Sequence, residues 1–132
     1  MLDSFNHPKH CTAALAALII LQGVMLAALF TQTPPHPPLT IPLFALGPFL
    51  GAALAVGVAA IILGASTSNA GRGAAMLAAA MALISFGPQK WIDPSIGQIW
   101  PAILFGQIAV IVISATCISG WRSNNLSEGV QS

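Results

Sequence analysis

The side chains best placed to do chemistry in this sequence are two amides. Gln22 and Gln107 each lie inside a long apolar stretch. An amide in such a place can hydrogen-bond to a neighbouring helix, an interaction worth about 1 kcal/mol. Its carbonyl oxygen can instead bind the magnesium of a chlorophyll, because hard cations accept oxygen ligands. Both interpretations remain open for the two residues.

The three histidines lie outside the apolar stretches. His7, His10 and Cys11 form an H-x-x-H-C pattern that could hold a metal or a pigment, but Pro8 interrupts helical geometry before His10. We therefore expect a solvated segment beside the membrane there, and no metal site. His36 stands between two proline pairs, where it is either an exposed loop residue or a chlorophyll ligand at the membrane edge.

The two cysteines lie near opposite ends of the chain. Neither Cys11 nor Cys117 belongs to a C-x-x-C pair. This spacing argues against a thioredoxin-like or quinone-coupled disulfide site and against a cysteine zinc site. We expect two small apolar side chains at helix ends.

The charged side chains that membrane chemistry usually needs are absent from the apolar stretches. Ion-coupled transport normally needs an ionisable group within the membrane, and haem binding by a helical bundle needs paired histidines there. No Ser-His-Asp set or carboxylate pair can form in the bilayer either. The sequence therefore predicts no catalytic residue, no enzyme and no soluble substrate. The charged residues, all outside the stretches, are Asp3, Lys9, Arg72, Lys90, Asp93, Arg122 and Glu128.

Composition indicates which solvent surrounds the chain. Of the 132 residues, 5% are charged and 56% are hydrophobic, whereas about a quarter of a soluble domain is charged. A small water-soluble domain needs polar residues to cover its relatively large surface. The 4 Lys and Arg residues are too few to track the phosphates of a nucleic acid. Lipid is therefore the expected solvent, and nucleic acid is not an expected partner.

Four apolar runs, at 11–30, 41–65, 74–86 and 101–120, set the expected fold class. A helix rises about 1.5 Å per residue, so about 20 residues cross a hydrocarbon core of ~30 Å. The third run reaches only about 25 Å when extended to 71–87. We predict an all-α integral membrane protein, a bundle of four transmembrane helices at about 11–30, 42–65, 71–87 and 100–120, in one domain over 1–132. The alternative is three spans plus a re-entrant helix.

The breaks between the runs and the basic residues give an expected orientation. Segment 31–42 contains five prolines, 66–73 is a polar turn rich in Gly and Ser, and 87–99 carries two proline turn signals. In both span models, three of the four Lys and Arg residues share one side. The positive-inside rule then places the N-terminus on the cytoplasmic side.

Small residues recur at a spacing of four in the second and third runs. Such rows let helix backbones approach closely. They either fill a small bundle or dock a neighbouring subunit, and the bulky fourth run would then face lipid or a partner. The helix-packing residues expected from this pattern are Gly47, Gly51, Ala55, Ala59, Ala74, Ala78 and Ala82.

Residues 41–56, IPLFALGPFLGAALAV, place a proline before a phenylalanine and a glycine-containing apolar helix. Through Pro42, Phe44, Pro48 and Gly51, this stretch resembles the helix start of small accessory membrane subunits of cyanobacterial photosystem I, of the PsaI-like kind. Those subunits usually cross the membrane once and close their helix with an acidic stretch, which this chain lacks. The resemblance implies an accessory subunit of the thylakoid membrane, in which the cytoplasmic side given by the positive-inside rule would be the stroma. Such a subunit would lie beside larger pigment-binding chains and contact chlorophyll and carotenoid.

The expected function is therefore a non-catalytic accessory or structural subunit of a large membrane complex, specifically a photosystem I-type complex. Its partners would be larger hydrophobic subunits and lipid. The candidate chlorophyll ligands are His10, Gln22, His36 and Gln107, although the resemblance itself carries over no ligand residue. One alternative is a small homo-oligomeric channel or facilitator whose pathway uses Gln22, Gln107, Ser114 and Thr116. The other is an assembly factor that binds a membrane complex transiently.

Overall fold

Four long helices account for most of the chain. The computed structural model describes residues 8–32, 43–94 and 96–131, and all regular structure within these ranges is helical. At about 1.5 Å per residue, the first three helices are about 36, 30 and 27 Å long. All four helices are long and apolar enough to cross a membrane, as predicted. The elements are α1 (Pro8–Thr31), α2 (Leu43–Ile62), α3 (Asn69–Phe86), the short 3-10 helix η2 (Pro88–Ile92) and α4 (Ile96–Gln131).

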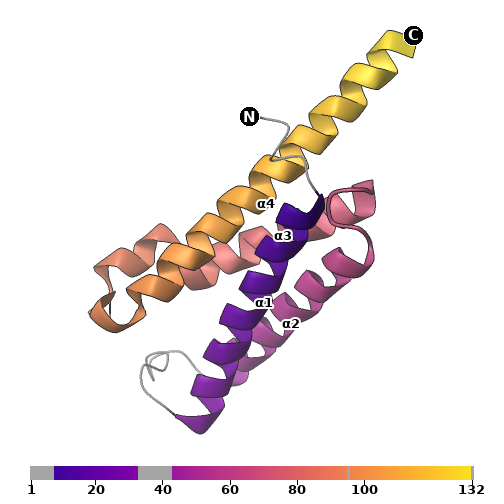
Figure 1. Ribbon diagram of the computed structural model, residues 1–132. Coiled ribbons are helices and arrows are strands. Elements are labelled where there is room, and N and C mark those ends of the chain that lie inside the picture. Colours follow the sequence, from indigo (N-terminus) through magenta and orange to yellow (C-terminus); the bar gives the residue numbers. More distant parts are fainter. Residues whose placement is uncertain (1–7, 33–42, 95, 132) are drawn as a thin grey trace.

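The helices form a four-helix bundle in which each long helix has two neighbours. Each consecutive pair packs together, and α1 closes the bundle by packing against α4 (Figure 1). Across the diagonal, α1 and α3 touch only slightly. The predicted bundle is thus found, and α3 is long enough that its length does not require a re-entrant arrangement.

Helix α4 is longer than the predicted fourth span. The expected span ended near residue 120, but α4 continues without a break to Gln131. With 36 residues it measures about 54 Å, well beyond a ~30 Å hydrocarbon core. Its last part, residues 122–130, is exposed and projects past the other three helices (yellow in Figure 1). The sequence placed a boundary there because polarity begins at Arg122, but polar residues can continue a helix in water.

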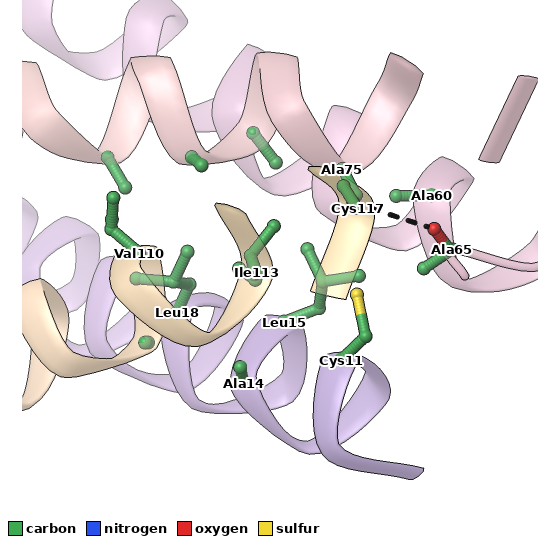
Figure 2. Close-up of a cluster of buried hydrophobic side chains, with 14 residues drawn as sticks. Cys11, Ala14, Leu15, Leu18, Ala60, Ala65, Ala75, Val110, Ile113 and Cys117 are labelled. Atoms are coloured by element: carbon green, nitrogen blue, oxygen red, sulfur yellow. Dashed lines mark hydrogen bonds between the residues drawn. The ribbon is translucent and has the colours of Figure 1, made fainter. Parts of the chain in front are cut away.

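The core is built by small residues facing larger ones. Helix α3 contributes a face of buried alanines, Ala75, Ala78, Ala79 and Ala82. Larger side chains of α1 and α4, among them Leu15, Leu18, Val110 and Ile113, fill the space that these alanines leave (Figure 2). Helix α4 therefore places large side chains both in the core and on the outer surface. Helix α2 contributes less to the core than the sequence pattern suggested.

A tight turn joins α2 to α3 and fixes the start of α3. Gly64 follows α2 with a φ of +81°, a conformation that favours glycine. Ser68 then links the two helices: its hydroxyl donates to the Leu63 carbonyl at 2.6 Å and accepts from the Gly71 amide at 2.9 Å. Gly71 lies so close to this turn that a Cβ atom there would overlap the Gly64 carbonyl. The turn thereby holds Arg72, one residue later, at a fixed position.

Candidate functional site

The two cysteines, at opposite ends of the sequence, meet inside the bundle. Cys11 on α1 and Cys117 on α4 are both fully buried and unoxidised. Both belong to one buried cluster, in which the Cys11 sulfur points towards Cys117 (Figure 2). The Cys117 sulfur also lies 3.8 Å from the carbonyl oxygens of Ala65 and Arg72. The sequence spacing did not predict this proximity, which arises because the antiparallel packing of α1 on α4 brings the two residues together.

Arg72 lies beside this thiol pair as a buried cation. Only 7% of its surface is exposed. Its Nη2 donates to the Ser66 carbonyl at 2.9 Å and its Nη1 donates to the Asn69 side chain at 3.1 Å, but Nε has no partner among the residues that the structure describes. The guanidinium fits against α4 because Gly120 has no side chain: a Cβ there would lie 2.6 Å from Nε.

No carboxylate among the described residues pairs with this guanidinium. Asp93 pairs with Lys90 at 3.9 Å, and Glu128 lies in the exposed part of α4. The sequence placed Arg72 in a polar turn, but α3 begins at Asn69 and takes Arg72 into its first turn. We call the region of Cys11, Cys117 and Arg72 the cysteine end of the bundle.

The opposite end contains a polar cluster held by several side-chain hydrogen bonds. Gln107 on α4 donates from Nε2 to the Phe86 carbonyl at 3.2 Å, and its Oε1 accepts from the Trp91 indole at 3.4 Å. Gln89 donates to the Leu83 and Ile84 carbonyls, each at 3.1 Å. These amides satisfy the last carbonyls of α3, which have no partner within the helix. We call the region of Phe86, Trp91 and Gln107 the tryptophan end.

The other predicted amide, Gln22, differs from Gln107 in its burial and in its hydrogen bonding. It is only 2% exposed, on the core side of α1, and its Nε2 has no hydrogen-bond partner. A buried amide nitrogen without a partner is energetically unfavourable. Of the two glutamines proposed as pigment ligands, Gln107 thus uses its oxygen for Trp91, whereas Gln22 retains an unsatisfied donor.

An apolar groove runs along the outside of the bundle between α1 and α4. Its volume is about 490 Å³. Alanines line much of it, and larger aliphatic and aromatic side chains stand beside them. His10 is exposed and lines the groove near the cysteine end, and it has a partner within the structure. The lining residues are His10, Ala13, Ala14, Ala17, Ile20, Leu21, Phe105, Ile108, Ala109 and Val112.

The predicted small-residue rows occupy different environments. On α3, Ala78 and Ala82 are buried and Ala74 is half-buried. On α2, Gly51 has open space where a Cβ would stand, and Ala55 is exposed. Gly47 approaches Phe30, at 3.6 Å from the position of a Cβ, and Ala59 is half-buried. The α3 row thus lies in the core, whereas the middle of the α2 row faces outward.

The remaining predicted ligands are not brought into a cluster. His7 and His36 lie outside the described residues. Among the described residues, no group of three or more His, Cys, Asp or Glu side chains could hold a metal ion. Sequence reasoning missed the pairing of the cysteines and the burial of Arg72, and a single sequence contains no local signal for either contact.

Comparisons with protein-family models, with curated proteins and with solved structures found no match for this chain. The fold and the residues described above are therefore the basis for a functional interpretation.

Proposed function

We propose that this chain is a multi-pass membrane subunit that acts by packing against larger hydrophobic membrane proteins. Four helices of membrane-spanning length support the membrane setting. Large apolar side chains are exposed on the outer faces, including Ile20, Phe105 and Ile111. Lipid or apolar protein must cover such surfaces.

The observation that carries this proposal is the groove between α1 and α4. Within a membrane, an exposed apolar face alone does not distinguish lipid from protein, because lipid tails are as apolar as leucine. Alanines at a helix surface do favour protein, since they allow another helix to approach closely. Ala13 and Ala17 are one turn apart on α1 and both line the groove. A transmembrane helix of a larger protein is the occupant that this surface fits.

The finer proposal is a photosystem I-type complex as the host, with chlorophyll and carotenoid nearby. It is supported only by the resemblance of residues 41–56 to the small accessory subunits. Of the residues that carry the likeness, Pro48 is exposed inside α2, and Gly51 leaves open space beside it. These positions are available to an external partner.

The channel alternative receives less support from the described residues. Thr116 donates to the carbonyls of Val112 and Ile113, at 2.9 and 3.0 Å. Gln107 is held by Phe86 and Trp91. Side chains committed to internal hydrogen bonds are poor elements of an aqueous path, so we do not pursue this function.

The test is gentle detergent extraction from native membranes, followed by native-mass analysis and an absorption spectrum. We expect the chain to migrate with larger hydrophobic proteins in fixed stoichiometry. Chlorophyll bands in that material would support the photosynthetic host, and their absence would reject the host while leaving the packing proposal intact. Recovery of the folded chain only as a free species would reject both.

A pair of variants tests the groove itself. Ala17→Leu fills the groove surface, and we expect it to reduce co-purification at least about 10-fold, because one lost close contact of ~1.4 kcal/mol is a factor of ten in binding. Ala80→Leu adds the same volume at an exposed position of α3 and should leave co-purification unchanged. Equal association of both variants with the partner would remove the groove from the interface.

A further inference from the structure

The cysteine end combines three features that small apolar packing does not explain. The only 2 cysteines in the chain lie together there in one buried cluster, although the helices that carry them are the first and the last (Figure 2). An arginine lies beside them with a buried, unpartnered Nε. No carboxylate of the described residues balances that arginine. A buried cation without an anion is costly, so an anionic group at this point would stabilise the bundle.

We propose that Cys11 and Cys117 form a two-thiolate site for a soft monovalent cation of the Cu(I) class. Thiolates are the preferred protein ligands of Cu(I). On binding, each thiol releases one proton, two metal–sulfur bonds form, and no electron is transferred. The product carries one net negative charge, because two thiolates surround one monovalent cation. The guanidinium of Arg72 then balances that charge.

The geometry places the balancing charge about one helical turn along α4 from Cys117. The Arg72 backbone carbonyl lies 3.8 Å from the Cys117 sulfur. The guanidinium rests against Gly120, which is about one helical turn from Cys117 on the same face of α4. Figure 2 shows the Cys11 sulfur pointing from α1 towards Cys117. Both ligands thus face one point at the junction of α1, α3 and α4.

The number of ligands selects the class of metal. Zinc in proteins usually takes four ligands, at least three from side chains. The described residues offer no group of three His, Cys, Asp or Glu side chains. Cu(I) is satisfied by two thiolates in a nearly linear arrangement. Two facing helices can provide this arrangement without any further side chain.

The site lies close to water although it is buried. Lys9, two residues before Cys11, is exposed, as is Arg122, five residues beyond Cys117. Cys11 also belongs to the first turn of α1, which lacks a full set of helical hydrogen bonds. Fraying of this turn would open the pair to a cation from the aqueous side.

The experiment uses the full chain, purified in detergent under reducing and oxygen-free conditions. Cu(I) is added in competition with the chelator bathocuproine disulfonate. We expect one Cu(I) per chain for the wild type, and at least about 100-fold weaker binding for Cys11→Ala and for Cys117→Ala, because each loses half of the ligand set. Thr12→Ala changes an exposed neighbour of Cys11 and should bind like the wild type.

A second measurement on the wild type covers the case in which a cysteine variant does not fold. Thiol labelling with a maleimide is followed with and without Cu(I), and we expect the metal to protect both thiols together. Binding no tighter than that of a Cys11→Ala/Cys117→Ala double variant would overturn the proposal, as would labelling unaffected by Cu(I). One Cu(I) per two chains would also overturn it, because the site would then lie between molecules. None of these outcomes bears on the packing function, which co-purification tests separately.

Discussion

The two ends of the bundle treat their polar side chains in opposite ways. At the tryptophan end, the side chains of Gln89 and Gln107 satisfy the last carbonyls of α3, and Trp91 completes the bonding of Gln107. At the cysteine end, Arg72 is buried with an unpartnered Nε. One end therefore pairs most of its helix-end carbonyls, whereas within the described part of the chain the other leaves a donor and a positive charge unmatched.

This difference indicates which end of the bundle has a structural role and which end binds a ligand. A complete hydrogen-bond network stabilises a helix end and requires no ligand. An incomplete network lowers stability, and such a feature often marks a functional site. We therefore interpret the tryptophan end as a structural clamp and the cysteine end as a binding site.

The largest expected effect tests whether the cysteine end is rigidly held. Gly71→Ala places a Cβ against the Gly64 backbone carbonyl, which cannot move without opening the α2–α3 turn. We expect the free energy of unfolding to fall by about 3 kcal/mol or more, which is at the upper end of the range for overpacking. Equilibrium unfolding in mixed micelles, followed by circular dichroism, measures it.

The control is Gly73→Ala, two residues further along α3, where a Cβ meets nothing within 4 Å. It should raise stability by up to about 1 kcal/mol through helix propensity. If both alanines had the same effect, the close approach of Gly71 to the turn would not contribute to stability.

A substitution at the tryptophan end should lower the free energy of unfolding by a smaller amount. Gln107→Leu removes the donor to the Phe86 carbonyl and the acceptor for Trp91. We expect a loss of about 1–2 kcal/mol, since hydrogen bonds between membrane helices are modest but a carbonyl is left unsatisfied. Gln98→Leu, at an exposed position of α4, should change the free energy of unfolding little. If Gln107→Leu left the free energy of unfolding unchanged, these hydrogen bonds would not contribute to stability.

The buried glutamine, Gln22, should respond with the opposite sign. Gln22→Leu removes an amide nitrogen that has no partner in the core of the bundle. We expect the free energy of unfolding to rise by about 1 kcal/mol, because the penalty for an unsatisfied buried donor disappears. Unfolding of the purified, pigment-free chain measures it against Gln107→Leu. A loss of stability would mean that Gln22 bonds through water or a bound molecule.

The sequence predicted much of the fold and little of the site, for a physical reason. Apolar run lengths and the breaks at 66–73 and 87–99 give four helices, because these are local properties of the chain. They do not reveal which face of a helix turns inward. Helix α1 is apolar all round, so its periodicity does not distinguish Leu15 in the core from exposed Ile20.

The contacts of the site depend on that missing information. Cys11 meets Cys117 only because α1 closes the bundle against α4. Arg72 is buried only because Gly120 leaves room for it on a helix far along the chain. The same limitation affected the α2 row: spacing identified Gly51 and Ala55 as small residues but could not show that they face away from the core.

The smallest expected effect on stability gives the sharpest comparison of the two ends. Arg72→Met removes a buried charge and keeps most of the side-chain volume, while the Ser66 carbonyl and Asn69 lose their donor. The relief of desolvation offsets the lost hydrogen bonds, so we expect the free energy of unfolding to change by no more than about 1 kcal/mol.

Cu(I) affinity should nevertheless fall about 10-fold in Arg72→Met, as it does when a group that supports metal ligands is removed. Arg72→Lys should retain most of that affinity, because the balancing charge remains. A loss of several kcal/mol in Arg72→Met, with equal Cu(I) affinity in all three proteins, would make the arginine a structural clamp like Gln107 and erase the difference between the ends.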